Sequence, residues 1–551
     1  MKHYLYILLL CIGAFFLHNA ATNVDIMESR NIVTAREMVT DGNWMVPTMN
    51  GELRLEKPPL PTWVAGAIEK VLPDSITAQR CAAGLMGCLW VVFFYLFARR
   101  LLDDEKYAFL STIVFLTCYQ IVLMGRTATW DIYCHAFMMG AIYYLSRAFY
   151  PRGDRSERRV WLWYALAGIF LGLSFMSKGP VSFFALLLPW LIAALFTLRR
   201  PQMRGHWGSF SLMLVIALAV SSAWYIYIYV YHPEASQAVV AKESGSWLNR
   251  NVRPWYYYWR YFTETGVWAI LTLAALAVPY WKRRMRWRKE YLFTLVWTVA
   301  ALILLSCMPE KKMRYLLPMM VPCALSVGLI LNHLRLNIRR DAWGRRLYVT
   351  NGILMSILTF GAAVALPVLS LTKELLPLAT SIIAALLLLA VSVWMLVSTL
   401  HLRPVTFTTS LGMLFFIAEA LLMGAIASIL GNPAAHSIAE TREVKALDAL
   451  PFYHNAKEEL RIELVYAAHR KIRPLDLTDS TAVSRALPCA IVTRGYAAQE
   501  LTPEILQKVD TLHIGFYDDN KHAPGTKHYN VLFHNCVTLL RAKAGATATT
   551  D

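Results

Sequence analysis

The feature that most constrains this chain is a series of thirteen apolar segments, each close to the roughly 20 residues that a helix needs to cross a bilayer. Hydrophobic residues make up 57% of the sequence and charged residues 16%, whereas a soluble protein carries about a quarter charged residues. A soluble globular fold is therefore excluded, and we expect an α-helical multi-pass membrane protein. The predicted spans are 4–22, 78–98, 107–125, 132–150, 161–177, 180–198, 208–230, 263–280, 291–307, 315–333, 347–370, 376–400 and 405–430.

The charged residues give these segments a direction. The net charge is +18, and every second connection is basic, from Arg99-Arg100 to Arg403. Because basic connections stay in the cytoplasm, this pattern predicts a cytoplasmic N-terminus, with the other connections and the C-terminus on the external side of the membrane. The positive charge is then explained without a nucleic-acid partner. The first apolar run also suits a signal peptide, but it lacks a clean small-x-small site, which favours a retained helix.

The connection after the first apolar segment, residues 23–77, is long and rich in charge. Asp25 and Glu28 have the spacing of a capping box, which predicts a helix over Ile26–Thr40 that stops at Gly42. Its apolar residues fall near one face, so we expect an amphipathic helix on the membrane surface.

Charged and aromatic residues gather in the connections on the predicted external side, where a membrane protein usually avoids charge unless it has a function. Lys and Arg bind phosphate through charge-assisted hydrogen bonds, and aromatic rings stack on sugar faces. A carboxylate can take the proton of an acceptor hydroxyl. Together they suit a ligand with a phosphate, a sugar and an apolar tail. The residues are Glu56, Lys57, Arg126, Asp131, Lys178, Lys242, Arg250, Arg253, Tyr256, Lys311, Lys312, Arg314 and Tyr315.

Each of these features also has a purely structural interpretation. Asp25 suits a helix cap, and Asp131 could cap the fourth apolar segment. Arg126 could reach lipid head groups, and the Lys311–Arg314 stretch could contact anionic lipids. The aromatic run 254–259 could be an interfacial belt rather than a sugar site.

The first-loop motifs closely resemble those of bacterial polyprenyl-phosphate-sugar glycosyltransferases, a superfamily that includes protein O-mannosyltransferases and lipid A aminoarabinose transferases. These motifs are Glu28-x-Arg30, Ala35-Arg36-Glu37-Met38, Asp41-Gly42-Asn43-Trp44, Pro47, Asn50-Gly51 and Glu56-Lys57-Pro58-Pro59. Later motifs that resemble the family are Arg126-Thr127 with Asp131, Ser177-Lys178-Gly179-Pro180, Arg253–Tyr258 and Lys311–Pro318. The family usually has an Asp directly before its Glu, where this chain has Met27.

The resemblance implies a C-type glycosyltransferase fold and an inverting transfer of a sugar from a polyprenyl monophosphate at the periplasmic face. It implies lipid A as acceptor and 4-amino-4-deoxy-L-arabinose as sugar, with a protein or another envelope glycan as the alternative acceptor. The implied catalytic residues are Glu28, Asp25 and Asp131. The implied substrate and phosphate ligands are Arg30, Glu56, Lys57, Arg126, Lys178, Arg253, Tyr256, Lys311, Arg314 and Tyr315. No cofactor is assigned, and a divalent metal is left open.

A transporter or flippase for a lipid-linked sugar would also need basic and aromatic residues at the membrane face. Transporters often contain inverted repeats and interrupted helices near the midplane. The sequence shows no internal repeat, and its functional charges fall on one predicted side only. This distribution favours an enzyme.

From residue 431 the chain becomes polar, so we expect a membrane domain over 1–430 and a small periplasmic α/β domain over 431–551 with a disordered tail from Ala542. Helices are predicted over 439–450 and 501–510, and strands over 461–467, 489–494, 511–517 and 530–541. Cys489 and Cys536 lie in this region and could form a disulfide or remain free thiols.

Overall fold

The computed structural model describes residues 2–151, 157–198, 200–239, 251–430, 432 and 435–543. The chain divides into two compact units. The helical unit comprises Met1–Ala21, Leu55–Val64 and Leu72–Ala425, and the sheet unit comprises Thr22–Arg54, Ala65–Val71 and Ile426–Asp551. The predicted boundary at residue 430 therefore remains a prediction, since part of the first loop groups with the C-terminal region.

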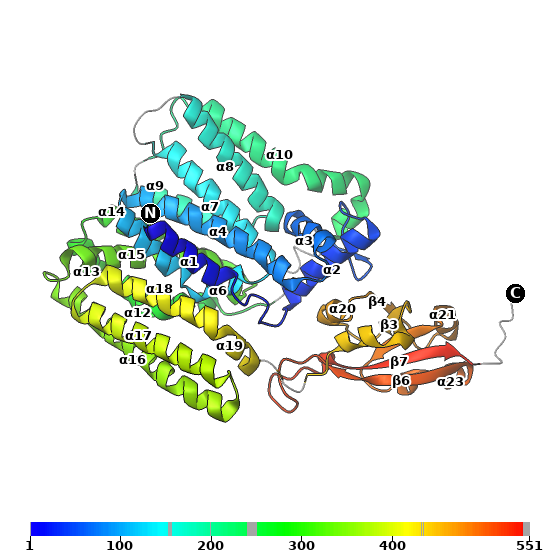
Figure 1. Ribbon diagram of the computed structural model, residues 1–551. Coiled ribbons are helices and arrows are strands. Elements are labelled where there is room, and N and C mark those ends of the chain that lie inside the picture. Colours follow the sequence, from blue (N-terminus) through cyan, green and yellow to red (C-terminus); the bar gives the residue numbers. More distant parts are fainter. Residues whose placement is uncertain are drawn as a thin grey trace. The chain divides into compact units, whose positions relative to one another are not determined.

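The helical unit is built from long apolar helices (Figure 1), so the predicted fold class is confirmed. Its helices are α1 (Lys2–Phe15), α4 (Ile76–Leu102), α5 (Glu105–Leu116), α6 (Tyr119–Gly125), α7 (Trp130–Phe149), α8 (Glu157–Lys178), η1 (Phe183–Leu187), α9 (Leu188–Thr197), α10 (Trp207–Tyr231), η2 (Trp255–Tyr258), η3 (Tyr261–Trp268), α12 (Ala269–Ala274), α13 (Val278–Arg284), α14 (Arg288–Cys307), η4 (Met313–Met319), α15 (Met320–Asn337), α16 (Ala342–Lys373), α17 (Leu378–Leu400) and α18 (Pro404–Leu421). Helix α19 (Met423–Leu430) is divided between the two units after Ala425. The short α3 (Leu60–Val71) is divided between the two units.

The predicted count of thirteen membrane spans is not confirmed. Among the described residues, eight helices are long and apolar enough to cross a membrane, or up to ten if each bent pair is one span. The α5–α6 pair bends by 67° and the stretch ending in α13 by 72°. Helix α1 has only 14 residues. Each predicted segment nevertheless contains a helix, so the apolar pattern located the helices better than it counted the crossings.

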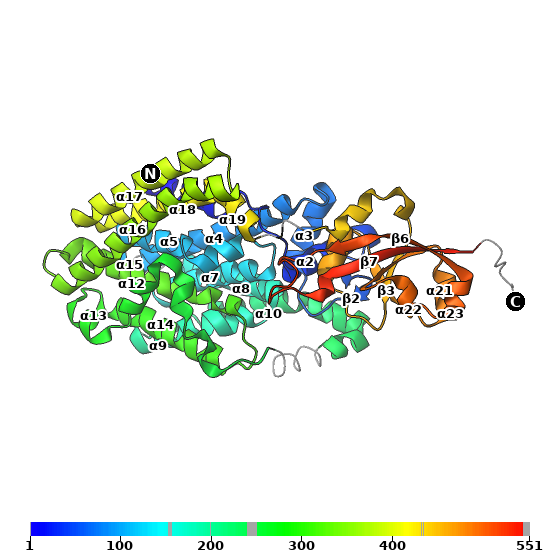
Figure 2. The same cartoon turned by 90° about the horizontal axis from the view of Figure 1, so that it is seen from below.

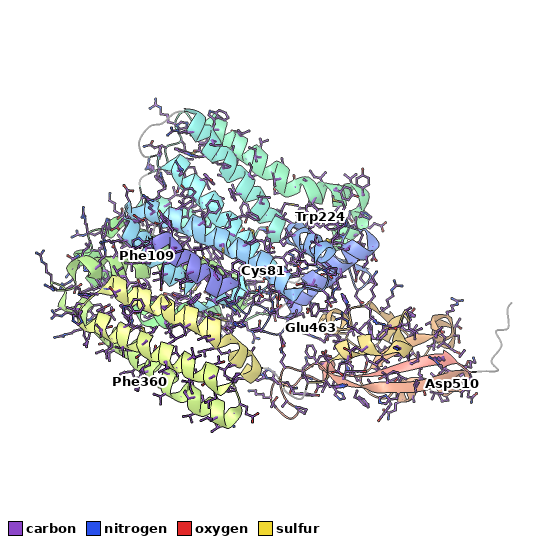
Figure 3. All side chains as sticks on the ribbon, in the orientation of Figure 1. Cys81, Phe109, Trp224, Phe360, Glu463 and Asp510 are labelled. Atoms are coloured by element: carbon purple, nitrogen blue, oxygen red, sulfur yellow. The ribbon has the colours of Figure 1, made fainter. Side chains whose placement is uncertain are left out.

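Helix α15 forms the centre of the helical unit, and nearly all of its residues are buried. It packs closely on α5 because Gly328 has no side chain: a Cβ there would lie 2.0 Å from Ser111 Oγ. At the periphery, α16 carries exposed apolar side chains such as Leu358 and Phe360 (Figure 3). An exposed apolar surface of this kind suits contact with lipid.

The sheet unit contains a five-stranded sheet in the order β4-β3-β5-β7-β6. Strands β3 (Phe452–Asn455), β4 (Ile472–Leu475) and β5 (Cys489–Thr493) pair in parallel, whereas β6 (Val509–Asp518) and β7 (His534–Ala542) form a long antiparallel pair (Figure 2). The other elements are α2 (Ile26–Asp41), β1 (Thr48–Met49), β2 (Glu52–Leu53), η5 (Ile438–Glu443), η6 (Lys445–Leu447), α20 (Ile462–Ala468), α21 (Ser480–Ala486), α22 (Ala497–Glu500), α23 (Pro503–Lys508) and η7 (Val531–Phe533).

The predicted first-loop helix is confirmed as α2, which begins after Asp25 and ends at Gly42 with φ +72°. Its expected position as an amphipathic helix on a membrane surface is wrong. The helix packs against α20 and β1, and Val33 lies in the core of the sheet unit beside Leu464. Polar residues of α2 are buried as well as apolar ones, so no face is left to lie on lipid.

In the C-terminal region the predicted strands 489–494, 511–517 and 530–541 coincide with β5, β6 and most of β7, and the helix 501–510 contains α23. The strand predicted over 461–467 is wrong, because this stretch forms α20 and buries Leu464, Val465 and Ala468 on one helical face. Short 3-10 turns replace the helix predicted over 439–450, and β3, β4 and α21 were not predicted. Cys489 and Cys536 are free thiols. Most of the predicted disordered tail lies outside the described residues.

Candidate functional site

The candidate site lies in the helical unit, where α7 begins and α8 ends. Asp131 is in the first turn of α7, two residues after the extended N-cap residue Thr129. Lys178 is the last residue of α8, and the helix stops there because Gly179 adopts φ +69° and Pro180 follows. Since α7 and α8 pack along each other, the start of one meets the end of the other.

Asp131 and Lys178 form a buried ion pair at this junction. The Lys178 ammonium donates to Asp131 Oδ1, and the two residues are only 7% and 1% exposed, respectively. An ammonium has three donors, so one hydrogen bond to Asp131 leaves two N–H groups for another ligand. Asp131 Oδ2 is buried and has no hydrogen-bond partner among the residues that the structure describes. A buried carboxylate usually satisfies both oxygens, so this pair is poised to hold a further polar group.

The segment around η4 covers the pair with a charged and aromatic layer. The Tyr315 ring centroid lies 5.6 Å from Lys178 Nζ and 5.9 Å from Lys312 Nζ. The Tyr315 hydroxyl donates to Glu310 Oε2 at 3.1 Å, and Lys312 Nζ lies 2.5 Å from Glu310 Oε1. Burial alone would raise the pKa of Glu310, but the Lys312 hydrogen bond and charge outweigh it and hold that pKa below its usual range. Arg314 adds positive charge to the electrostatic field at Asp131.

A cavity of about 250 Å³ opens beside this cluster. Val181, Phe184, Ala185, Leu305 and Met308 line it with apolar groups, and His135, Tyr258, Glu310 and Tyr315 supply polar ones at its wall. The cavity therefore combines an apolar interior with ionisable groups close to Asp131 and Lys178. Such a combination is typical of a binding site for a ligand that has both an apolar and a polar part.

Sequence reasoning identified Asp131, Lys178, Arg314 and Tyr315, and the structure brings these residues together. It also named Lys312, and it named Tyr258 as part of the aromatic run, but it missed His135 and Glu310. His135 could have been found, because it lies one turn after Asp131 and so shares its helix face. Its ring is buried, and Nδ1 lacks a hydrogen-bond partner within the described part of the chain.

Arg126, predicted as a substrate ligand, makes several contacts within the protein. Its Nε donates to the carbonyl of Ala14 and its Nη2 to that of Gly13, both at 2.7 Å. It also forms a buried ion pair with Glu419 on α18. A guanidinium at the last carbonyls of α1 compensates the negative end of that helix. These contacts suit a structural role, but Arg126 Nη1 is buried and has no hydrogen-bond partner in the described part of the chain, and the substrate role of Arg126 stays a prediction.

Lys311 likewise serves as an anchor. Its ammonium is buried and donates to the carbonyls of Met308 and Arg253, at 2.5 Å and 3.1 Å. Burial lowers the pKa of Lys311. Its contacts tie the aromatic loop to the end of α14, and the hydroxyl of Tyr258 reinforces this link by accepting from the Lys312 N–H at 2.9 Å.

The aromatic run divides into a buried anchor and an exposed surface. Tyr258 is fully buried, whereas Trp255, Tyr256 and Trp259 are more than half exposed. The Arg253 side chain is exposed as well. Both earlier interpretations of the run, a sugar surface and an interfacial belt, remain predictions. Lys242 and Arg250 of the same connection lie outside the described residues.

Asp25 and Glu28 form a capping box at the start of α2. Asp25 Oδ1 accepts the backbone N–H groups of Met27 and Glu28, both at 2.8 Å, and Glu28 Oε2 accepts the Asp25 N–H at 3.3 Å. Asp25 and Glu28 thus cap helix α2 in the sheet unit, and their catalytic role stays a proposal. In the same unit, the Arg30 carbonyl accepts a hydrogen bond from the Arg54 side chain.

We expect Asp25→Ala to destabilise the sheet unit by about 1 kcal/mol, because the cap of α2 is lost. Asp25→Asn should keep nearly full stability, since an amide oxygen can accept the same backbone hydrogen bonds. Thermal unfolding of the two purified variants measures this difference. If Asp25 acts only as a cap, Asp25→Asn will also retain sugar transfer; loss of transfer in a stable Asn variant would assign it a chemical role.

Glu56 and Lys57 belong to the part of the first loop that lies in the helical unit, and both are half-buried. Thr62, a few residues further along, accepts a hydrogen bond from Trp130 Nε1 at 3.4 Å. Trp130 directly precedes Asp131, so the segment that carries Lys57 approaches the N-terminus of α7. Among the described residues, no group of three or more His, Cys, Asp or Glu side chains is placed to hold a metal ion.

Comparison with known proteins supports the resemblance noted in the sequence. The model of a family described as dolichyl-phosphate-mannose-protein mannosyltransferase matches residues 56–227. An undecaprenyl phosphate-alpha-4-amino-4-deoxy-L-arabinose arabinosyl transferase of Pseudomonas fluorescens Pf-5 is 28% identical over 357 residues, covering 63% of this chain and 62% of the relative. A relative with the same description from strain Pf0-1 is 26% identical over 388 residues, covering 69% of this chain and 65% of the relative. The chain thus spans slightly less than two thirds of these relatives.

The fold has a counterpart among solved structures. The crystal structure of ArnT from Cupriavidus metallidurans bound to undecaprenyl phosphate aligns over 100% of this chain and 98% of its own, with a TM-score of 0.68 and 18% identity. The apo form of the same protein aligns with a TM-score of 0.67. The chain is therefore a multi-pass membrane protein with the fold of this transferase, and its resemblance to the polyprenyl-phosphate-sugar glycosyltransferases is confirmed.

Proposed function

We propose that this protein is a glycosyltransferase that moves a sugar from undecaprenyl phosphate to an acceptor on the periplasmic side of the bacterial inner membrane. The observation that carries the proposal is the buried Asp131–Lys178 pair beside a cavity with apolar walls. A polyprenyl-phosphate sugar offers matching parts: an anionic phosphate for the ammonium and an apolar chain for the cavity. The printed descriptions of the relatives name the same class of carrier.

In the proposed reaction an oxygen of the acceptor attacks the anomeric carbon of the sugar, and the bond from that carbon to the phosphate oxygen breaks. The electron pair of the broken bond leaves with the polyprenyl phosphate, which gains negative charge. We assign the stabilisation of this negative charge to Lys57, Lys178 and Arg314. Asp131 holds the Lys178 ammonium in position, which makes it a positioning residue for the phosphate.

We further propose lipid A as the acceptor and 4-amino-4-deoxy-L-arabinose as the sugar, on the strength of the relatives' descriptions and the first-loop motifs. A phosphate acceptor such as that of lipid A is already an anion and needs little help from a base. Glu28 and Asp25 would then orient the acceptor or bind an amino group, rather than remove a proton.

Mass spectrometry of lipid A from host cells with and without the gene tests this proposal. We expect the deletion to remove one aminopentose-sized substituent from a phosphate, and complementation with the wild-type gene to restore it. Complementation with a Lys178→Met gene should not restore it, at equal protein level in the membrane. An unchanged lipid A profile in the deletion strain contradicts lipid A as the acceptor.

A protein acceptor is the second candidate, because the matching family model is described as a protein mannosyltransferase. A hydroxyl of Ser or Thr would need a general base, unlike a phosphate, and Asp131 Oδ2 is the buried carboxylate oxygen available for that role. Comparison of periplasmic glycoproteins from the same two strains distinguishes the two acceptors. Loss of glycan from periplasmic proteins, with lipid A unchanged, supports the protein acceptor.

A further inference from the structure

A second charged region lies at the other ends of the helices that build the candidate site. Helix α14 has 20 residues, so it is about 30 Å long, close to the hydrocarbon thickness of a bilayer. The segment after its C-terminus carries Glu310 and Lys311, whereas Arg286 and Arg288 lie at its N-terminus. Likewise η4 and α15 begin at Met313, with Tyr315 near the candidate site, and end at Asn337. The two regions therefore face opposite sides of the membrane.

The sequence of this region separates its charged from its apolar side chains. Between α13 and α14 the chain is not helical, and Met285 is extended with ψ 135°. In an extended backbone, alternate side chains point to opposite sides. Met285 is buried and Trp287 half-buried, whereas Arg284, Arg286 and Arg288 are exposed. One side of the segment thus packs on the protein, and the other presents three guanidinium groups.

These arginines line a hollow of about 700 Å³ together with Met285, Leu336 and Asn337. Arg284 Nη1 lies 3.9 Å from Asp341 Oδ1, and Arg288 Nη2 donates to the Arg283 carbonyl at 3.2 Å. Within the described ranges, neither Arg286 nor Arg288 forms a salt bridge. Arg286 Cζ lies 5.6 Å from the centroid of the Trp287 ring, a contact that leaves its charge in place. The hollow is therefore strongly cationic, and Asp341 compensates only the charge of Arg284.

The position of Arg286 and Arg288 also disfavours a purely structural role. They lie at the N-terminus of α14, where the helix dipole is positive and destabilises nearby cations. Glu290 in the first turn compensates only part of this charge. A bound anion would satisfy the arginines and the helix end at the same time. The segment thus has the electrostatics of an anion site.

The surroundings of the hollow indicate a lipid rather than a dissolved anion. Leu336 is 49% exposed beside the arginines, and Trp343 is 43% exposed next to Tyr280 and Trp281. Exposed aromatic residues at the end of a membrane helix mark the head-group region. A phosphate carried by a lipid would enter the hollow while its acyl chains cover Leu336.

We propose that this hollow binds the phosphate head group of an anionic phospholipid on the face opposite the transfer site. Basic pockets between membrane helices on the cytoplasmic side commonly bind such head groups. Arg286 and Arg288 supply the charge-assisted hydrogen bonds, and Arg284 is partly engaged by Asp341. The proposal is independent of the transferase reaction, because it rests on a separate set of residues.

Native mass spectrometry of the full-length protein, titrated with phosphatidylglycerol, phosphatidylcholine or inorganic phosphate, tests this site. We expect the wild type to bind phosphatidylglycerol at least about tenfold more tightly than phosphatidylcholine, and Arg286→Gln/Arg288→Gln to lose that preference. The control Arg345→Gln/Arg346→Gln removes the same charge from exposed positions in α16 and should keep it. Arg286→Lys/Arg288→Lys retains the charge and should keep most of the binding.

Three results would overturn the proposal. Equal loss of preference in the Arg345/Arg346 control would mean that overall charge, rather than this hollow, selects the lipid. Unchanged preference in Arg286→Gln/Arg288→Gln would place the lipid elsewhere. If inorganic phosphate alone competes as well as the lipid does, the ligand is a dissolved anion. Because Arg286 and Arg288 are exposed, the glutamine variant is expected to fold, and its elution as a monodisperse protein verifies this.

Discussion

Lys178→Met is expected to abolish sugar transfer and to destabilise the protein. The substitution leaves the Asp131 carboxylate buried without its cation, and breaking a buried pair in this way costs about 3–5 kcal/mol. It also removes the ammonium proposed to stabilise the departing phosphate. Thermal unfolding in detergent measures the first effect, and transfer from a polyprenyl-phosphate sugar to purified acceptor measures the second.

The two effects can be separated with a second substitution. Asp131→Asn/Lys178→Met removes both charges, and we expect it to recover most of the lost stability, because a neutral pair needs no compensation in an apolar environment. Transfer should remain absent, since the phosphate has no cation. Asp131→Asn alone should fold and also fail to transfer. The Arg335–Asp104 pair at 2.7 Å provides the control, because Arg335→Met breaks a partly exposed ion pair and should leave transfer intact. Full activity in the double variant would show that Asp131 and Lys178 are not part of the transfer site.

The sequence could identify Asp131 and Lys178 but not their pairing. Both are charges at the ends of apolar segments, where charge is expensive and usually functional. They lie 47 positions apart, and only the packing of α7 on α8 brings them together. The apolar cavity beside them was not predictable either, because its lining comes from η1, α14 and the aromatic loop.

The same sequence signal is present at Arg126 and Lys311, whose roles as substrate ligands stay predictions. Each is a cation near the end of an apolar segment, as Lys178 is. In the structure carbonyl groups accept hydrogen bonds from both residues. Arg126 donates from Nε and Nη2 at the end of α1, and Lys311 donates to Met308 and Arg253. Arg126 Nη1 is buried and has no hydrogen-bond partner among the described residues. Whether a cation meets a ligand or the last carbonyls of another segment depends on where that segment ends in space. Hydropathy does not contain this information.

In the fold, too, the features set by local sequence were predictable, whereas those set by tertiary packing were not. Long apolar runs predicted helices well, because helices satisfy the backbone within lipid from local hydrogen bonds alone. The bend between α5 and α6 lies at Thr117 and Cys118, where no proline or glycine in the sequence predicts it. The short apolar run at 461–467 suits a strand as well as a helix, and its packing as α20 decided the outcome.

Lys57→Ala is expected to lower transfer by about 10²–10³-fold, the usual cost of losing one group that stabilises developing negative charge. Lys57 lies in a half-buried loop stretch before α3, so the substitution should leave thermal stability within about 0.5 kcal/mol of the wild type. Because the charge on the phosphate grows as the sugar leaves, the loss should fall more on kcat than on KM for the donor. Initial rates over a range of donor concentrations measure both constants.

Two further variants decide whether the charge of Lys57 matters in this position. Lys57→Arg keeps a cation that can bind phosphate, although with different geometry, and should retain part of the activity. Lys70→Ala removes an exposed lysine from the last turn of α3 and should have no effect on transfer. If Lys57→Ala transfers sugar at the wild-type rate, or if Lys70→Ala is equally impaired, the ammonium of Lys57 does not stabilise the leaving phosphate. The hydrogen bond from Trp130 to Thr62 would then serve only to hold α3 against α7.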